Sequence, residues 1–379
     1  MKILLLGEYS NMHATLADGF RKLGHEVTVA SNGDFWKNYP RDVDLARREG
    51  KLGGLQLMAK VYAQLPQWRG FDVVQLINPM FLELKAERLF PIYRYLRRHN
   101  RRIFLGAFGM DYYWVHVCTY DKPLRYSDFN IGSDVRTDPD AIKEQRDWLG
   151  TPKERLNRLI AQTADGIIAN LYEYWRCYHP AFPEKTVYIP SPISPSNPSS
   201  PSSPSSPSSP SSPSSPSGPS GPIKLFLGIS KARSTYKGTD IMLRAARDLQ
   251  QKYPDRLTLQ IAEGLPFAQY QQLMDGSDVI LDQLYSYTPS MNSLLAMSKG
   301  IVVVGGGEPE CYDILNETEL RPIINVLPYY DSVYHELEQL ILHPERLPLL
   351  KQQSIDFVRK HHDTLKVARQ YLDFYTKKG

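Results

Sequence analysis

Short apolar runs alternate with segments of helical periodicity along the whole chain. Six runs precede residue 190 and five follow residue 222. Runs that are apolar at consecutive positions are buried on both faces, which is typical of parallel strands covered by helices. The eleven runs are residues 2–7, 26–30, 72–77, 102–106, 166–169, 186–189, 223–229, 256–261, 278–282, 301–306 and 322–326. The pattern therefore predicts an α/β protein made of two Rossmann-like, doubly wound domains in tandem.

A low-complexity segment divides the chain. Residues 194–222 are almost entirely Ser and Pro in a three-residue period. The segment has no apolar side chain to bury and lacks an amide donor at every third residue, so we expect an extended, polyproline-like linker. Its regularity fits an engineered linker that replaces a native loop as well as it fits a native one. The sequence thus predicts a first domain over residues 1–193, a second over 223–353 and C-terminal helices over 354–379.

Composition narrows the class of protein. Of the 379 residues, 42% are hydrophobic, and no run of about 18 uncharged apolar residues predicts a transmembrane span. The apolar start is broken by Glu8 and lacks a small-residue cleavage site, which predicts a cytoplasmic protein. Cys118, Cys177 and Cys311 are too far apart for a disulfide framework or a thiolate zinc site. The net charge of +4 is small and no nucleic-acid motif accompanies it, so we expect no nucleic-acid partner.

The loop after the first apolar run of the second domain is one candidate site. Lys231, Arg233 and Lys237 crowd this loop, and Gly238 stands at the start of the helix that follows. Cations, free amides and a helix amino terminus all favour an anion, so the loop predicts a diphosphate-binding site that needs no metal. The simpler alternative is a solvated loop with scattered basic residues.

A second candidate site lies between residues 282 and 315. A polar loop, a small-residue helix and a buried strand lead into three consecutive glycines, where a ligand can approach the chain without side-chain obstruction. Ser290 and Asn292 stand at the helix start, where they either cap the helix or contact a phosphate. The residues expected to line this part of the site are Ser290, Asn292, Gly306, Gly307, Glu308 and Glu310.

These two stretches resemble the donor half of GT-B glycosyltransferases, in particular the large retaining class called family four. The resemblance rests on Arg233 and Lys237 in the first loop, on LLAMSKGIVVV and on the GGGEPE turn. GHEVTV near residue 27, FDVVQLINP near residue 75 and GAFGMDYYW near residue 109 resemble the acceptor half of the same enzymes. The resemblance implies a cleft between the two domains and C-terminal helices that cross back to the first domain. It also implies that Arg233 and Lys237 bind the donor diphosphate.

The sequence departs from this family at two positions. The family has two glutamates that contact the donor sugar and the ribose, and Tyr287 and Leu295 stand in their places. Either another group holds the ribose, for which Glu263, Glu308 and Glu310 are candidates, or donor binding has been lost. Glu310 best matches the glutamate of the family's glycine-rich turn, although an exposed carboxylate at a helix start is the simpler interpretation.

In the acceptor half, Asp111 follows a strand end and resembles the aspartate of the family's histidine-glycine-serine-aspartate stretch. A carboxylate there can orient an acceptor hydroxyl, or act as general base if the enzyme inverts. The aromatic residues 112–114 suit either stacking on a sugar ring or core packing. Basic residues gather at 41–51 and 94–102, which indicates either peripheral contact with an anionic membrane or a solvated surface.

The leading hypothesis is a hexosyltransferase-type, retaining glycosyltransferase that moves a sugar from a nucleotide-sugar donor to a glycan or lipid-linked acceptor in polysaccharide biosynthesis. Arg233 and Lys237 would neutralise charge on the leaving diphosphate, and a retaining transfer needs no separate protein base. We expect no cofactor and no metal, and a place in the cytoplasm or at the inner face of the membrane. Two alternatives stay open. One is a sugar-nucleotide epimerase of the same fold, and the other is a non-catalytic sugar- or nucleotide-binding protein, which the loss of both motif glutamates supports.

Overall fold

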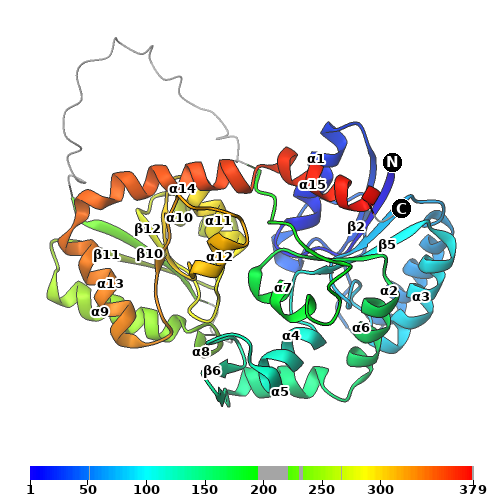
Figure 1. The fold of residues 1–379 in the computed structure, drawn as a ribbon, viewed down its shortest axis with the longest axis horizontal. Helices are drawn as coiled ribbons and strands as arrows, with labels where there is room; N and C mark the ends of the chain where they lie inside the picture. The colour runs from blue at the N-terminus through cyan, green and yellow to red at the C-terminus, as the bar shows by residue number, and fades with distance from the viewer. Residues whose placement is uncertain (51, 195–220, 230–233, 266, 378–379) are drawn as a thin grey trace, which may run out of the picture.

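The structure is a computed structural model that describes residues 1–379 except 51, 195–220, 230–233, 266, 378 and 379. Figure 1 shows two lobes side by side, the first coloured blue to green and the second yellow-green to orange. Each lobe holds a parallel sheet with helices on both faces. The predicted α/β fold with two doubly wound domains is therefore confirmed.

The first lobe is built on seven parallel strands in the order β3-β2-β1-β4-β5-β8-β9. The strands are β1 (Lys2–Leu6), β2 (Glu26–Ser31), β3 (Val43–Asp44), β4 (Val73–Leu76), β5 (Arg102–Ala107), β8 (Gly166–Ala169) and β9 (Thr186–Tyr188). The helices on its faces include α1 (Met12–Lys22), α2 (Gly53–Gln64), α3 (Ala86–His99), α6 (Pro152–Thr163) and α7 (Tyr172–Tyr178). Six strands coincide with the apolar runs of the first half. The seventh, β3, is only two residues long and has no such run.

The second lobe is built on five parallel strands in the order β11-β10-β12-β13-β14. All five coincide with apolar runs: β10 (Ile223–Ile229), β11 (Leu257–Glu263), β12 (Val279–Leu281), β13 (Val302–Gly305) and β14 (Ile324–Asn325). Its helices are α8 (Ser234–Lys237), α9 (Thr239–Lys252), α10 (Phe267–Asp275), α11 (Met291–Ser298), α12 (Pro309–Asp313) and α13 (Tyr330–Leu342).

An excursion from the first lobe, residues 112–148, reaches the second lobe. It contains α4 (Tyr112–His116), a π-helical turn (Val117–Asp121), the antiparallel hairpin β6 (Asn130–Ile131) and β7 (Asp134–Val135), and α5 (Pro139–Trp148). Figure 1 shows β6 beside α8. Buried Arg136 makes the contact, because its guanidinium donates to the carbonyl oxygens of Tyr236 at 3.2 Å and Thr235 at 3.1 Å. The excursion therefore joins the two lobes beside the proposed diphosphate loop.

The last two helices also connect the lobes. Helix α14 (Leu347–His361) packs on α11 in the second lobe, and α15 (Thr364–Lys377) packs on α1 in the first. Tyr371 and Tyr375 of α15 are fully buried against Phe20 of α1. Gly19 permits the close approach of the two helices, since a Cβ there would lie 2.9 Å from the Ala368 Cβ.

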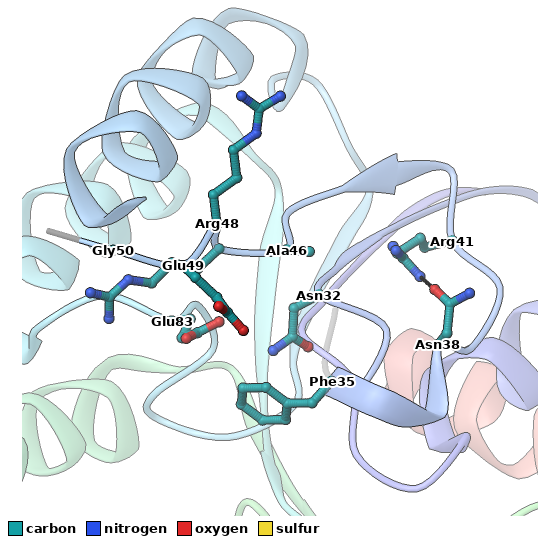
Figure 2. A pocket seen from close by; sticks show the side chains of 10 residues that line it. Asn32, Phe35, Asn38, Arg41, Ala46, Arg48, Glu49, Gly50 and Glu83 are labelled. Carbon is teal, nitrogen blue, oxygen red and sulfur yellow. Dashed lines mark hydrogen bonds between the residues drawn. The ribbon is translucent and has the colours of Figure 1, made fainter. Parts of the chain in front are cut away.

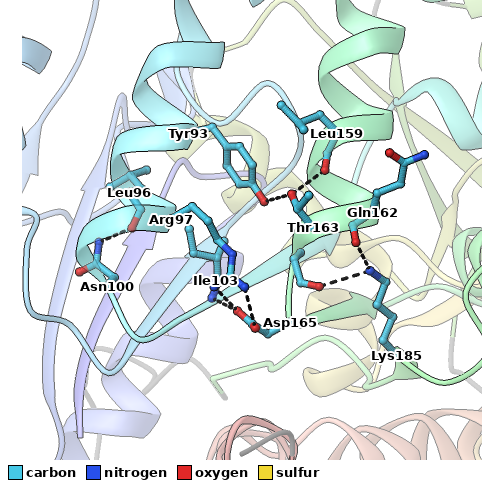
Figure 3. A network of polar contacts seen from close by, with 11 residues as sticks. Tyr93, Leu96, Arg97, Asn100, Ile103, Leu159, Gln162, Thr163, Asp165 and Lys185 are labelled. Carbon is cyan, nitrogen blue, oxygen red and sulfur yellow. Dashed lines mark hydrogen bonds and ion pairs between the residues drawn. The ribbon is translucent and has the colours of Figure 1, made fainter.

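Figure 3 shows a polar network at the amino ends of the strands of the first sheet, opposite the edge where ligands of such sheets bind. Asp165, just before β8, accepts from the Ile103 amide at 2.7 Å and from both terminal nitrogens of Arg97 at 3.1 and 3.2 Å. Tyr93 and Thr163 join α3 to α6 with a hydrogen bond of 2.6 Å. Arg97, one of the basic residues near the end of α3, is thus engaged in holding the fold.

Candidate active site

The proposed diphosphate loop is described from Ser234 onward, and Lys231 and Arg233 lie outside the described residues. Lys237 ends α8 and is half-buried. Gly238 caps α9 with a φ of 74°, and a Cβ there would lie 2.8 Å from that of Leu284. Only glycine fits this turn without strain. The loop after β12 therefore supports the Lys237–Gly238 turn, and the Leu284 amide donates to the Lys237 carbonyl oxygen at 3.0 Å.

Ser290, Asn292 and Glu263 lie around the same edge of the second sheet. Ser290 caps α11, because its hydroxyl oxygen accepts from the Ser293 amide at 3.2 Å while it donates to Asp282 at 3.0 Å. The amide of Asn292 donates to the Tyr270 hydroxyl at 2.7 Å. Glu263 ends β11 in register with Ile229, the last residue of β10. The cap is the observed role of Ser290, and ligand contacts of the three residues stay predictions.

Gly306 and Gly307 are required by packing in this structure. A Cβ on Gly306 would lie 2.2 Å from the Ser286 carbonyl oxygen, and one on Gly307 would lie 2.7 Å from Ile323 Cγ2. Neither glycine has the left-handed backbone conformation. The missing side chain of Gly306 lets the turn after β13 pack against the loop after β12, and that of Gly307 lets the same turn pack against Ile323 before β14.

Glu308 and Glu310, at the start of α12, bind one arginine of the first domain. Nη1 of Arg125 donates to Glu310 Oε1 at 2.7 Å, and Nη2 donates to Glu308 Oε2 at 2.7 Å and Glu310 Oε2 at 3.0 Å. Burial tends to raise the pKa of Glu310, but hydrogen bonds from Arg125 outweigh it and leave that pKa below its usual value. Buried Glu308 also accepts from the Tyr126 hydroxyl at 2.5 Å. Two of the three candidate ribose-binding carboxylates, Glu308 and Glu310, are thus held by residues 125 and 126 of the excursion.

Tyr287, which stands where the family has its first motif glutamate, packs into the core of the first domain. Its ring is 1% exposed and lies between the rings of Tyr126 and Tyr172, with centroids 5.0 and 5.9 Å away. Its hydroxyl accepts from the Arg125 amide at 2.7 Å. Leu295 packs against the apolar core of the second domain. Both side chains therefore take part in packing.

Glu173 of α7 makes a further contact between the domains. Its side chain is buried, and Oε1 accepts from the Ser286 hydroxyl at 2.5 Å, the Tyr287 amide at 2.6 Å and the Thr288 amide at 3.1 Å. Oε2 accepts from the Thr288 hydroxyl at 2.5 Å. Two amides and two hydroxyls of one short segment therefore surround a single carboxylate from the other domain.

The first domain contains two adjoining cavities. The larger, about 660 Å³, is lined by the loops after β1 and β4 and by α5, including Glu8, Tyr9, Asn78, Met110 and Lys143. The smaller, about 460 Å³, shares Phe35, Arg47 and Glu83 with it. Figure 2 shows the smaller cavity, where Glu49 and Glu83 point toward one another and Arg48 points away from them. Both cavities are lined by cations, carboxylates and apolar side chains.

Glu8 lies in the loop between β1 and α1. Its carboxylate accepts from the amides of His13 at 3.2 Å and Ala14 at 2.8 Å. Burial raises the pKa of Glu8 to about 8 despite these two hydrogen bonds. Burial also lowers the pKa of His13 to about 3, so the neutral ring donates from Nδ1 to the Gly7 carbonyl oxygen at 2.8 Å. This helix amino terminus is already occupied by the chain's own carboxyl group.

Asp111 is buried at the start of α4. Oδ1 accepts from the Trp114 amide at 2.9 Å and Oδ2 accepts from the Tyr178 hydroxyl at 2.8 Å. Burial raises the pKa of Asp111 to about 7, against the effect of these hydrogen bonds. The rings of residues 112–114 are buried as well, which fits core packing and not stacking on a sugar ring. Asp111 caps a helix here, and its catalytic role stays a prediction.

The sequence did not single out the interface residues Arg125, Tyr126, Arg136 and Glu173. Glu173 follows the strand run at 166–169 by four residues, so inspection of every strand end would have selected it. Arg125 and Arg136 lie in the excursion, which has no long apolar run to mark it. Their partners in the second domain lie more than 95 positions away along the chain, and no sequence pattern predicts these contacts.

No protein-family model matches the sequence, and no curated protein matches it. Among solved structures, the chain is similar to HepE from Anabaena in complex with UDP, with 13% identity, a TM-score of 0.53 and 100% of both chains covered. It is similar to sucrose-phosphate synthase from Thermosynechococcus elongatus, with 13% identity, a TM-score of 0.61, and 100% of this chain and 99% of that chain covered. It is also similar to the UDP-GlcNAc 2-epimerase from Neisseria meningitidis bound to UDP-GlcNAc, with 12% identity, a TM-score of 0.53 and 100% of both chains covered.

These similarities establish the fold. Two Rossmann-like domains are arranged as in GT-B proteins, as the sequence resemblance implied. Within the described residues, no helix is long and apolar enough to cross a membrane. In the same part of the chain, no three His, Cys, Asp or Glu side chains are grouped so as to hold a metal ion.

Proposed function

We propose that the protein is a glycosyltransferase that takes its sugar from a nucleotide diphosphate donor. The observation that carries the proposal is the single donor-side surface, in which the Lys237–Gly238 turn, the loop after β12 and the glutamates of the GGGEPE turn adjoin one another. A cation beside a helix amino terminus suits a diphosphate, and carboxylates suit ribose or sugar hydroxyls. GT-B proteins that bind UDP or UDP-sugars share this fold, which supports the proposal.

The acceptor binds, in this proposal, in the paired cavities of the first domain. Helix α5 contributes Lys143 and Glu144 to the larger cavity, while Arg136 just before it contacts the α8 carbonyls. The excursion thus touches both the donor surface and the acceptor cavity. The acceptor is a glycan or a lipid-linked sugar, and the exposed cations Arg47 and Arg48 at the cavity mouth would face an anionic membrane in the second case.

Transfer is proposed to proceed with retention and without metal. Lys237, with Arg233, neutralises negative charge on the leaving diphosphate, which is the largest electrostatic demand of the step. Glu8 and Asp111 both use their carboxylate oxygens to cap helices, so neither is free of structural partners. A retaining transfer suits such a site because it needs no separate protein base.

The test is an assay of a panel of nucleotide sugars with and without glycan acceptors. Transfer releases the nucleoside diphosphate and lengthens the acceptor, whereas an epimerase changes the sugar and a non-catalytic protein does neither. Lys237→Ala should abolish release, and Lys224→Ala is the matched control, because Lys224 is exposed near the amino end of β10. Turnover that is equal in the two variants would refute the assignment of the donor loop.

A further inference from the structure

The segment Ser286–Thr288 has the chemistry of an oxyanion site. Four neutral donors converge on the Glu173 carboxylate, namely the amides of Tyr287 and Thr288 and the hydroxyls of Ser286 and Thr288, at 2.5 to 3.1 Å. The Ser286 hydroxyl also lies 2.8 Å from the Thr288 carbonyl oxygen, a second acceptor for its single hydrogen. Ser286, Tyr287 and Thr288 are all buried, so no bulk water replaces these hydrogen bonds. Carboxylates and phosphates share the geometry that such a cluster accepts. The cluster is therefore complementary to an oxyanion in general and not to glutamate alone.

The position of this cluster connects it to the proposed donor surface. It follows β12, and its backbone packs on Gly306 of the glycine turn. The Glu308 amide donates to the Tyr287 carbonyl oxygen at 3.2 Å. Two residues before the cluster, the Leu284 amide donates to the Lys237 carbonyl oxygen. The four donors thus lie on the same strand-end surface as Lys237 and Glu308.

We propose that Ser286–Thr288 is an oxyanion subsite of the donor surface and that Glu173 occupies it as an internal substitute for the ligand. The proposal rests on the proposed function, because it takes the ligand to be a phosphoryl or carboxylate group of the donor. Glu173 holds the two domains together while the subsite is free of ligand. An incoming oxyanion binds the same four donors only when Glu173 leaves, so ligand binding and separation of the domains at α7 are coupled.

The contact differs from an ordinary ion pair between domains. An ion pair would give Glu173 a cationic partner, and the partners found are neutral amides and hydroxyls. The cation next to the cluster, Arg125, lies over the Tyr287 ring at 5.0 Å and pairs with Glu308 and Glu310, not with Glu173. Loss of Glu173 therefore leaves the Arg125 contact in place and four donors available to an anion.

Glu173→Ala tests the subsite by removing the internal carboxylate. The probe is pyrophosphate, with glucuronate as the second probe, and the readout is the dissociation constant from calorimetry. We expect Glu173→Ala to bind pyrophosphate at least about tenfold more tightly than the wild type, because no competitor must be displaced. Tighter binding of glucuronate instead would assign the subsite to a sugar carboxylate. The matched control is Glu345→Gln, since Glu345 is exposed and paired with His343, and its affinity should equal that of the wild type.

Adding Thr288→Val to the Glu173→Ala variant tests whether the bound anion uses the donors of Ser286–Thr288. It removes one hydroxyl without changing the shape of the side chain, and should reverse most of the gain in affinity. If Glu173→Ala does not fold, Glu173→Gln serves instead, because it keeps the shape but removes the charge. Small-angle scattering of the wild type should show a larger radius of gyration when the probe is bound.

The outcomes separate this inference from the proposed function. Unchanged or weaker affinity of Glu173→Ala for both probes overturns the subsite, even if the wild type transfers sugar from nucleotide donors. A gain in affinity that Thr288→Val removes supports the subsite, even if no nucleotide sugar is ever consumed. A gain that survives Thr288→Val places the bound anion elsewhere and also overturns the proposal.

Discussion

Replacing Arg125 by methionine tests how strongly the two domains are tied together, because methionine keeps an aliphatic chain but removes the guanidinium. The Glu308 side chain is only 5% exposed, and a charge-assisted hydrogen bond to such a group contributes about 1.5 to 3 kcal/mol. Glu310 is 26% exposed and Arg125 itself 55% exposed, so solvent screens their pair and about 0 to 1 kcal/mol is expected there. Tyr126 still donates to Glu308 in the variant. We therefore expect a loss of about 2 kcal/mol.

The assay is urea unfolding followed by tryptophan fluorescence. All five tryptophans lie in the first half of the chain, so the signal reports the first domain alone. With a urea dependence of about 2 kcal/mol per M, the loss should lower the midpoint by about 1 M. Arg21→Met is the control, since Arg21 pairs with Asp42 inside the first domain with both side chains 45% exposed. A shift for Arg125→Met no larger than for this control would refute coupling of the domains through Arg125.

Four further predictions follow from the structure. UDP should raise the melting temperature of the wild type, and Lys237→Ala should remove most of that protection, since a charge-assisted contact to phosphate contributes roughly 1.5 to 3 kcal/mol; equal protection in the variant would place the phosphate elsewhere. Exchanging residues 194–222 for a Gly/Ser linker should leave the melting temperature nearly unchanged, because the segment has no apolar side chains to bury, and a large drop would contradict this. If Asp111 contacts the acceptor, Asp111→Asn should reduce transfer by about two to four orders of magnitude while UDP binding persists; wild-type turnover would leave Asp111 as a helix cap only. Burial raises the pKa of Glu8 to about 8, so the stability that the neutral Glu8 carboxyl group contributes is complete below about pH 4 and is lost as the pH rises through 8. Glutamine does not ionise, so the urea midpoint of Glu8→Gln should fall less than that of the wild type between pH 5 and pH 8.

The strands were predictable because each is a local signal. A run such as 301–306 is apolar at consecutive positions only if both faces of its strand are covered, and β13 meets that condition in the structure. The apolar runs did not predict strands that are not covered on both faces. The hairpin of β6 and β7 has two residues in each strand and its own residues are partly exposed, so it leaves no apolar run.

The candidate site was predictable on one side only. Glu308 and Glu310 follow a buried strand and a glycine turn, which mark a strand end at which ligands of α/β sheets bind. Their partner Arg125 lies more than 180 positions earlier, and only the relative placement of the two domains brings it there. The same holds for Glu173 and Thr288, because local sequence carries no information about which residue of another domain will meet a given loop.

If Ser286–Thr288 is the proposed subsite, the interface between the domains couples stability to ligand binding, and loss of Glu173 changes the two quantities with opposite signs. Contacts through Arg125 and Glu173 favour the closed arrangement, in which Glu173 occupies the donors of Ser286–Thr288. A ligand that needs those donors binds only the open fraction, so its apparent affinity is reduced in proportion to that fraction. A variant that destabilises one domain away from this interface should lower the urea midpoint and leave the affinity for pyrophosphate unchanged. Glu173→Ala should instead lower the midpoint and raise the affinity for pyrophosphate, because the buried carboxylate that stabilises the interface is also the competitor for its ligand.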